Sequence, residues 1–395
     1  MSTRENIFVF VVCGSREHID TLHFSLDALK RFSKNKIIVL TDTLRNEIPV
    51  EHGDVIDIRT PERLDHHQAS IYLKTGIHHF LPGGSLYCYL DTDVVALDAE
   101  ADTIFSRYVS PITFAKDHCG IDTFSPAAIR CGCQEKFDRN NEKLTKYIAE
   151  YKTSYAPRID YINTCFDEIH VLEKKLKESK NRYRWHKLKY KMPGRYYALT
   201  EDYKMDKQTG YWYDRHGFWL IRDLLHFVFD RTGFRWVDDK EEWQDESGVS
   251  FSNPTCTHLV GEIKNRYGVM ITPPDWNHWN GGVFLFDDSS HIFLEEWHRA
   301  TMSIFDDVRW KTRDQGTLAM TVWKLGLQNH PTLAPGFNFI ADYNSNKYVH
   351  HGDLSFTARD YGETLKPVFI HLFHHWGDDG WSVWSAVKKH TENND

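Results

Sequence analysis

The sequence lacks an excess of positive charge. It holds 48 Lys and Arg residues against 56 Asp and Glu residues, which gives a formal net charge of −8 at pH 7. A protein that binds nucleic acid through its phosphates needs a basic field, and this composition does not supply one. We therefore expect no nucleic-acid partner.

A long apolar run is also absent. The first apolar segment, residues 7–13, is too short for a signal peptide, and no later run reaches the about 20 residues that a membrane helix needs. We therefore expect a cytoplasmic protein with no transmembrane segment. Hydrophobic residues still make up 41% of the 395 positions, which excludes a wholly disordered chain and suits one large α/β domain with insertions or two smaller domains.

Cysteine is scarce, and no Cys-x-x-Cys pair occurs among the seven cysteines. Their odd number does not suit a complete disulfide framework. The Cys131-Gly-Cys133 pair is by itself too tight for a tetrahedral zinc clip. Buried thiols in a reducing compartment are therefore the expectation.

The first third of the chain alternates strand and helix patterns. Four short apolar runs have the length of buried strands: 7–13, 36–40, 55–58 and 86–90. Residues 19–31 and 69–79 between them repeat apolar side chains at helical spacing. Alternation of this kind, with short loops, predicts a parallel sheet with helices on both faces, and such sheets bind ligands beyond the carboxyl ends of their strands.

The alternation stops after about residue 133 and resumes near residue 276. We predict an α/β half over 1–133, a mostly helical insertion over 134–275, and the C-terminal part of the same core over 276–395. The predicted insertion contains a basic and aromatic stretch, residues 180–191. This stretch is either a solvated helix end or a contact for an acidic acceptor, a phosphate or a membrane surface.

Two carboxylates one residue apart close the fourth apolar run. Asp91-Thr92-Asp93 stands where a strand opens into a turn, so that the two side chains can project together. Carboxylate oxygens are preferred ligands of Mg²⁺ and Mn²⁺, and a bound divalent cation removes the repulsion between the two carboxylate charges. A turn in which Asp caps a helix or meets solvent is the alternative. We favour a metal site at Asp91 and Asp93.

Four motifs in order resemble those of the GT-A glycosyltransferases, and are most similar to the family-8-like retaining enzymes that use UDP-sugar donors. They lie at residues 69–74 with 81–83 and 89–95, then 280–286, 314–318 and 368–371. The resemblance covers about residues 1–115 and 276–376. It implies an α/β, Rossmann-like GT-A fold of a nucleotide-diphospho-sugar transferase, with a large mostly helical insertion over 134–275 that is a candidate acceptor region.

The resemblance also implies roles for individual residues around the donor sugar. In the family, a basic residue at the position of Lys74 contacts the donor, and the Asn at the position of Asn280 reaches the donor sugar. The residues at Asp314 and Gln315 contact sugar hydroxyls near the reacting carbon. Asn280, Asp314 and Gln315 are therefore the catalytic candidates. A strand-end turn for Asn280 and a helix cap for Asp314 are the structural alternatives.

The implied metal ligands are Asp91, Asp93 and His371, which would hold Mn²⁺ or Mg²⁺ against the two phosphates of the donor. The family's closing motif continues from its His to a Lys-Pro-Trp that helps to hold the diphosphate, whereas here His374 and His375 follow and no Lys stands in that place. Strand parity favours His371 as the ligand and leaves His374 or His375 to face the phosphate.

The nucleotide itself would lie beyond the first two strands. Gly14 and Ser15 would allow its close approach, and Thr41 and Asp42 would meet its base or ribose. An ordinary strand-to-loop turn explains Gly14 equally well. Rings near the strand ends are candidates to stack on an acceptor sugar, with a role in the core as the alternative: Trp276, His278, Trp279, Trp376 and Trp381.

The function that this resemblance implies is that of a metal-dependent hexosyltransferase in carbohydrate biosynthesis. It would move a sugar from a UDP-sugar to a glycan, glycolipid or glycoprotein acceptor with retention of configuration, and a peripheral membrane contact is compatible with it. An inverting enzyme on the same fold would need a carboxylate base, for which Asp275 or Asp314 is available. A catalytically silent nucleotide-sugar- or carbohydrate-binding protein and a metal-dependent phosphohydrolase are the further alternatives.

Overall fold

The chain forms two compact units that are described separately below. The structure is a computed structural model and describes residues 4–251, 254–343, 347–358 and 362–392. Unit 1 comprises Met1–Cys131 and Thr255–Asp395, and unit 2 comprises Gly132–Pro254. The second unit is thus inserted into the first. Residues 255–275, which the sequence analysis places in the insertion, lie in unit 1.

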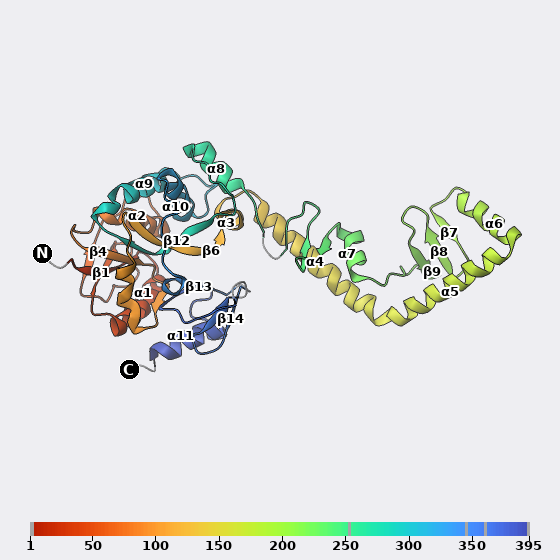
Figure 1. The fold of residues 1–395 in the computed structure, drawn as a ribbon, viewed down its shortest axis with the longest axis horizontal. Helices are drawn as coiled ribbons and strands as arrows, with labels where there is room; N and C mark the ends of the chain where they lie inside the picture. Colours follow the sequence, from red (N-terminus) through yellow and green to blue (C-terminus); the bar gives the residue numbers. More distant parts are fainter. Residues whose placement is uncertain (1–3, 252–253, 344–346, 359–361, 393–395) are drawn as a thin grey trace. The chain divides into compact units, whose positions relative to one another are not determined.

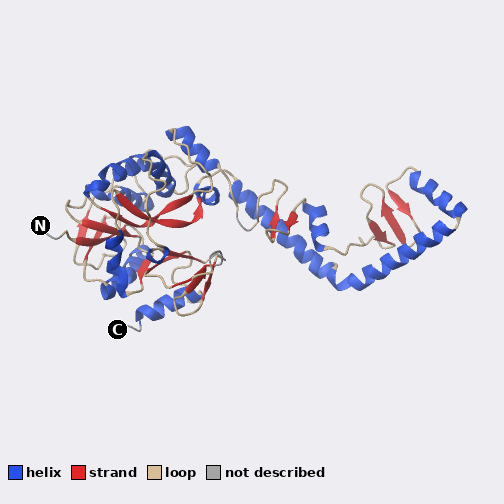
Figure 2. Ribbon diagram, viewed as in Figure 1, coloured by secondary structure: helices blue, strands red, loops and turns tan. Residues whose placement is uncertain are grey.

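Unit 1 is built on a six-stranded sheet in the order β3-β2-β1-β4-β12-β6 (Figure 1, Figure 2). Its strands are β1 (Asn6–Val12), β2 (Lys36–Thr41), β3 (Val55–Asp57), β4 (Leu86–Leu90), β6 (Ile112–Gly120) and β12 (Asn277–Phe286). The first four strands are parallel, whereas β12 runs antiparallel to both β4 and β6. The sheet is therefore mixed and parallel-rich, which confirms the predicted α/β class and the parallel pairing expected for the four strands of the first third.

Helices cover both faces of this sheet, as predicted. They are α1 (Arg16–Phe32), α2 (His66–Thr75), α9 (His291–Met302) and α10 (Arg313–Lys324). Alternate residues of β1 enter different cores: Phe8 and Phe10 pack with residues of α1, and Val9 packs with residues of α2, α9 and α10. This division explains why the β1 sequence is apolar at nearly every position.

Smaller elements complete unit 1. Strands β13 (Phe339–Asp342), β17 (Phe369–Phe373) and β5 (Val94–Ala96) form a three-stranded sheet, and β14 (Tyr348–His350), β15 (Phe356–Ala358) and β16 (Thr364–Leu365) form another. The remaining helices are α3 (Ile121–Ala128), α8 (His258–Tyr267) and α11 (Ser382–Glu392), with short turns η1 (Ile77–His79), η2 (Ala99–Arg107), η4 (Asp288–Ser290) and η5 (Pro335–Phe337). The last predicted strand, β17, thus joins β5 rather than the central sheet.

Unit 2 has its own core and is mostly helical. Its helices are α4 (Cys133–Ser154), η3 (Ala156–Arg158), α5 (Ile159–Glu178), α6 (Lys180–Lys191) and α7 (Leu224–Thr232). Two small sheets hold β7 (Tyr196–Ala198), β8 (Tyr203–Asp206) and β9 (Trp212–Asp214), and β10 (Arg235–Val237) and β11 (Glu242–Gln244). Aromatic residues such as Tyr151, Trp219 and Phe227 dominate the core. Among the described residues, none of the helices is both long and apolar enough to cross a membrane.

The packing of α9 on the central sheet generates a stability prediction. Phe293 is 1% exposed and its ring lies 5.6 Å from that of Phe114, whereas the neighbouring Ile292 is 72% exposed. Phe293→Ala should lower the free energy of unfolding by about 3–5 kcal/mol because it leaves a cavity. Ile292→Ala should change it by less than about 0.5 kcal/mol. Denaturant unfolding followed by circular dichroism checks both, and equal losses would contradict this packing.

Candidate active site

The acidic pair lies where β4 gives way to β5. The peptide N–H of Asp91 donates to Gly282 O at 2.8 Å, and Val94 N–H donates back to Asp91 O at 3.0 Å, which closes a tight turn. The turn places Asp91 and Asp93 at the carboxyl end of the central sheet. Tyr89 Oη also donates to an Asp91 oxygen at 2.5 Å.

A histidine from a distant part of the chain completes this group. His371 lies on β17, which pairs with β5 so that His371 stands opposite Val94. Ligand atoms of Asp91, Asp93 and His371 all lie within 4.8 Å of one another, and His371 Nε2 is 3.3 Å from Asp93 Oδ1. Two carboxylate oxygens and one imidazole nitrogen are a donor set that suits Mn²⁺ or Mg²⁺.

Asp93 and His371 shift each other's pKa values. Burial opposes the charged form of each group, yet their mutual attraction and hydrogen bond outweigh it. The pKa of Asp93 is therefore lowered and the pKa of His371 is raised. The carboxylate and the imidazole therefore each favour the charged form of the other.

Lys74 forms ion pairs with two of the carboxylates. Its Nζ lies 3.1 Å from Asp91 Oδ1 and 3.3 Å from Asp314 Oδ2, so it bridges the end of β4 and the start of α10. Burial by itself would lower the pKa of Lys74, but Asp91 and Asp314 raise it, and the ammonium stays charged. Asp314 is thus an ion-pair partner, and the helix cap considered from the sequence is not formed by its side chain.

Asn280 sits in a polar network on β12. Its Nδ2 donates to Asp117 Oδ2 at 2.9 Å, and its Oδ1 accepts from Asn338 Nδ2 at 3.1 Å and from Gly282 N–H at 2.8 Å. Asn338 Oδ1 lies 3.2 Å from His371 Nδ1. The network therefore connects the histidine of the acidic group to the strand that carries Asn280.

Gln315 is tied to the backbone of the same strand. Its Oε1 accepts from Gly281 N–H at 3.1 Å, and its Nε2 donates to Trp279 O. The β12–β6 register shifts between Asn280 and Phe284, and this irregularity presents the Gly281 amide to Gln315. Gln315, Asp314 and Asn280, the predicted catalytic residues, thus lie on two elements that hydrogen bonds join.

The glycines after Asn280 are required by close approach. A Cβ on Gly282 would lie 2.6 Å from His371 Cε1, and one on Gly281 would lie 3.2 Å from Gln315 Oε1. Side chains at these positions would displace the histidine and the glutamine. The Asn-Gly-Gly sequence therefore reflects the crowding of β12 against both residues.

Of the predicted nucleotide-binding residues, Thr41 and Asp42 are buried, whereas Ser15 lines a surface hollow. Gly14 adopts φ +106, and Ser15 caps α1 by accepting from His18 N–H. Thr41 is buried, and its hydroxyl donates to Val12 O at 2.7 Å. Asp42 is also buried, and its carboxylate accepts from Thr60, Arg45 and Arg59. Thr41 and Asp42 therefore hold loops in place, while Ser15 lines an open hollow beside Arg16 and Trp376.

The remaining predicted site residues, His374, His375, Trp279 and Trp381, lie outside the acidic group. His374 and His375 follow β17 with left-handed backbones at φ 62 and 52, and both are exposed. His374 Nδ1 lies 3.2 Å from Asp342 Oδ1. Trp279 and Trp381 are 1% and 7% exposed, so these rings belong to the core and do not stack on an acceptor as expected.

Sequence reasoning missed two residues of this network, Asp117 and Asn338. Burial would raise the pKa of Asp117, but His278, His118 and Asn280 together lower it and keep the carboxylate charged. Asp117 lies in the polar segment Lys-Asp-His-Cys near the end of β6. The acidic residue beside a histidine at a strand end is the sequence feature that could have identified it. Asn338 follows η5, in a segment without a recognisable pattern.

No protein-family model matches the chain, and no curated protein matches it. Among solved structures, the chain is similar to the WbbM bifunctional glycosyltransferase at 10% identity and TM-score 0.44, over 100% of this chain and 50% of that chain. This chain therefore spans half the length of the WbbM chain. It is also similar to mouse xyloside xylosyltransferase 1, at 9% identity and TM-score 0.38, over 93% of this chain and 97% of that chain.

A third similar structure is the galactosyltransferase LgtC in complex with donor and acceptor sugar analogs. Its identity is 12% and its TM-score is 0.38, over 98% of this chain and 94% of that chain. All three proteins are glycosyltransferases by name. At these TM-scores the likeness carries no argument about what this chain does.

The bridge between Lys74 and Asp314 generates a second prediction. Lys74→Met should destabilise the chain by about 3 kcal/mol in metal-free buffer, because two partly buried carboxylates lose their counter-charge. Asp314→Asn in the same background should recover part of that loss, with a coupling free energy of about 0.5–3 kcal/mol. A double-mutant cycle from denaturant unfolding measures it.

Lys30→Met is the matched control for this cycle. The Lys30 side chain is 44% exposed and pairs with an exposed Asp27. Its replacement should cost less than about 1 kcal/mol. A coupling near zero between Lys74 and Asp314 would contradict a structural ion pair at this position.

Proposed function

We propose that this chain is a metal-dependent glycosyltransferase of the GT-A type that uses a nucleoside-diphosphate sugar, with UDP-sugars as the first candidates. The observation that carries the proposal is the convergence of Asp91, Asp93 and His371 at the carboxyl end of the central sheet. Ligands of open α/β sheets bind at this end. Lys74, Asn280 and Gln315 surround the same group, as the resemblance in the sequence implies.

The acidic group supports a donor with a diphosphate leaving group. Asp91, Asp93 and His371 would hold a divalent cation, Mn²⁺ or Mg²⁺, which when bound stabilises the charge that develops on a departing diphosphate. The pair of carboxylates has the oxygen ligands that such a cation prefers. Lys74 would keep Asp91 oriented through its ion pair and adds a positive charge next to the phosphates.

The amide side chains of Asn280 and Gln315 favour a sugar, rather than a bare phosphate, as the group that is transferred. Both are neutral amides that can form hydrogen bonds with hydroxyl groups, and both are half-buried near the acidic group. Their present hydrogen bonds to Asp117 and to the β12 backbone hold them in fixed orientations. A fixed amide is preorganised for hydroxyl groups of a donor sugar.

Retention of configuration is the finer part of the proposal. An inverting enzyme needs a carboxylate that is free to take the acceptor's proton. Asp314 is engaged by Lys74 at 3.3 Å, which favours a mechanism in which the leaving phosphate accepts that proton. The exposed Asp275 on the turn before β12 is the carboxylate that an inverting mechanism would have to use. The anomeric configuration of the product, read by NMR, tests this part separately.

The proposal predicts that metal and donor bind together. Wild-type protein should show a thermal shift with one UDP-sugar that depends on Mn²⁺, since binding to the folded state raises its stability. Asp93→Asn should abolish this shift and reduce donor hydrolysis and transfer at least 100-fold, which corresponds to about 2.7 kcal/mol. Asp27→Asn, at an exposed position of α1, is the control and should behave as wild type.

Two outcomes would contradict the proposal. Undiminished sugar transfer by wild-type protein in excess EDTA would remove the metal from the reaction. A Mn²⁺-dependent shift that Asp93→Asn retains in full would place the donor elsewhere. A shift without any turnover in the presence of acceptors would instead identify the catalytically silent binding protein.

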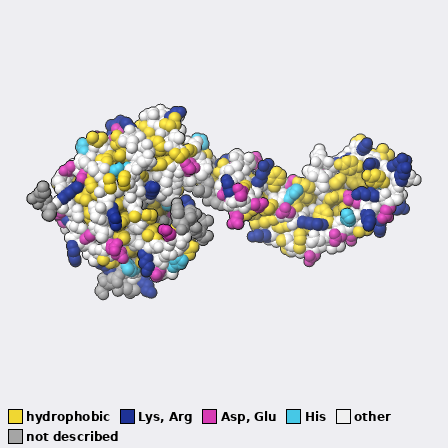
Figure 3. Space-filling model, viewed as in Figure 1, with side chains coloured by type: hydrophobic (Ala, Val, Ile, Leu, Met, Phe, Trp, Pro, Cys, Tyr) yellow, Lys and Arg dark blue, Asp and Glu magenta, His cyan; other side chains and the backbone are white. Residues whose placement is uncertain are grey.

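Unit 2 carries a candidate acceptor surface of its own. Helix α6 has no buried residue, and its Trp185 and Tyr190 are exposed. Lys and Arg side chains gather on the surface over this helix (Figure 3). A basic surface with exposed aromatic rings suits an acidic glycan or an anionic membrane that presents a lipid-linked acceptor.

The α6 surface generates a fourth prediction. Changing Lys187, Lys189 and Lys191 to Glu should lower transfer to an anionic acceptor at low salt by about tenfold, which corresponds to 1.4 kcal/mol. Hydrolysis of the donor in the absence of acceptor should stay unchanged. The matched control changes Lys143, Lys146 and Lys152 of α4 to Glu. Loss of donor hydrolysis in the α6 variant would show that the helix supports folding rather than the acceptor.

A further inference from the structure

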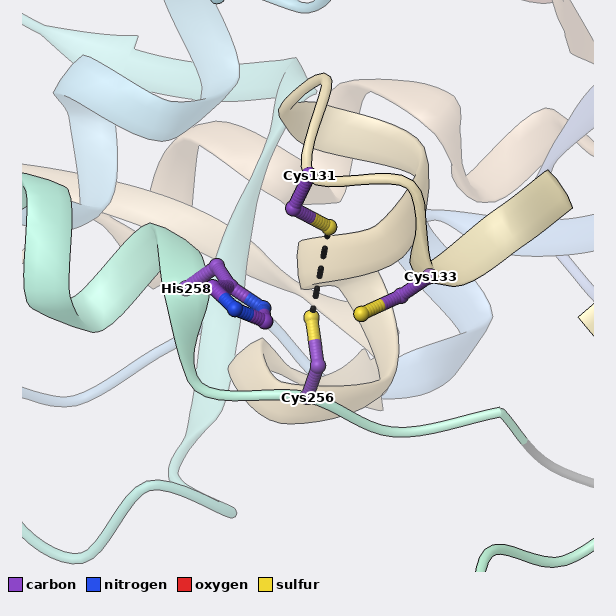
Figure 4. A group of neighbouring side chains, drawn as sticks. All are labelled: Cys131, Cys133, Cys256 and His258. Atoms are coloured by element: carbon purple, nitrogen blue, oxygen red, sulfur yellow. Dashed lines mark hydrogen bonds between the residues drawn. The ribbon is translucent and has the colours of Figure 1, made fainter. Parts of the chain in front are cut away.

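A second group of metal-ligating side chains lies outside the acidic group. It comprises Cys131, Cys133, Cys256 and His258, and one ligand atom from each lies within 4.8 Å of all the others. Figure 4 shows the three sulfur atoms and the imidazole turned toward a common point. Cys131 and Cys133 come from one short segment, and Cys256 and His258 come from another.

The first pair is held by a sharp turn at the start of α4. Gly132 adopts φ 78, the left-handed conformation that glycine favours, and lets Cys131 and Cys133 turn their side chains to the same side. The segment before Cys131 is joined to the C-terminal part of unit 1, because Arg130 N–H donates to Arg309 O at 2.7 Å. Cys133 is separated from Cys131 by this single glycine and belongs to the same local turn.

The second pair is anchored at the start of α8. Cys256 N–H donates to Asp122 O at 2.9 Å, and Cys256 Sγ lies 3.1 Å from Ser125 Oγ. The same Ser125 hydroxyl accepts from Leu259 N–H at 2.9 Å, just after His258. Helix α3 therefore positions both residues of the second pair against the first.

The separations suit a tetrahedral zinc ion. Two thiolates that share Zn²⁺ at about 2.3 Å each stand about 3.8 Å apart in a tetrahedron. Cys131 Sγ and Cys256 Sγ are 3.8 Å apart. Three soft sulfur ligands and one imidazole also select zinc over the hard cations that suit the acidic group.

We propose that Cys131, Cys133, Cys256 and His258 bind one structural Zn²⁺. The set supplies four protein ligands and leaves no coordination position for substrate, which distinguishes a structural from a catalytic zinc site. The tight Cys131-Gly-Cys133 pair becomes a ligand pair because the fold adds Cys256 and His258. The three thiols are only half-buried, in contrast to the buried thiols expected from the sequence.

The position of the site defines what the metal would do. Unit 1 ends at Cys131 and resumes at Thr255, so the two pairs stand where the chain leaves and re-enters unit 1. A zinc ion would link these two points and close the whole inserted segment as a loop. Closing a long loop restricts the unfolded chain and stabilises the folded one. This role is independent of the proposed transferase activity.

The test begins with metal content. Untagged full-length protein, purified without chelators from zinc-supplemented cells, should contain one equivalent of zinc by mass spectrometry of the metal. Cys133→Ser and Cys256→Ser should each lose it, whereas Cys165→Ala, which removes a buried thiol of unit 2, should retain it. Asp93→Asn should also retain it, which separates this site from the acidic group.

A second measurement uses the wild-type chain and needs no variant to fold. After removal of zinc, Co²⁺ should restore a spectrum with cysteine-to-cobalt charge-transfer bands and tetrahedral d–d bands. Zinc should protect Cys131, Cys133 and Cys256 from alkylation, as read by peptide mass spectrometry. Absence of bound zinc together with a cobalt spectrum that lacks the charge-transfer bands would overturn the proposal, as would zinc retained by both serine variants.

Discussion

The crowding of like charges at one end of the central sheet constrains the rest of this structure. The carboxylates of Asp91, Asp93 and Asp314 gather around Lys74 and His371, and such charges repel unless cations stand between them. Lys74 pairs with Asp91 and Asp314, and His371 pairs with Asp93. These contacts keep Asp91 and Asp93 side by side, as the proposed divalent cation requires.

The chain topology brings these charges together from distant segments. Lys74 ends α2, the acidic pair follows β4, Asp314 starts α10 and His371 lies on β17. The antiparallel strand β12 passes among them, and Gly281 and Gly282 let it come close to Gln315 and His371. Asn280 and Asn338 join the same strand to His371 by hydrogen bonds. Elements from both halves of unit 1 therefore hold the candidate site together through hydrogen bonds and ion pairs.

Much of this arrangement is predictable from the sequence, for identifiable reasons. The strand and helix periods of the first 90 residues predict the α/β class, and the acidic turn directly follows a recognisable strand. Lys74, Asn280, Asp314 and His371 are singled out by the resemblance of their motifs to those of the GT-A glycosyltransferases. Long-range pairing is what the sequence leaves undetermined. Periodicity does not reveal that β12 runs antiparallel, that β17 joins β5, that Asn338 bridges to His371, or that Cys256 and His258 meet Cys131 and Cys133. Thr41 and Asp42 also lie at a strand end, but their side chains form hydrogen bonds with neighbouring residues of unit 1.

The central claim is that the acidic pair and His371 hold a cation that carries a nucleoside diphosphate. Anomalous scattering from a crystal soaked with MnCl₂ and UDP tests it most directly. The account predicts a manganese peak bonded to Asp91, Asp93 and His371 and to oxygens of both phosphates. A peak that touches neither carboxylate, with UDP bound elsewhere on the chain, would contradict it.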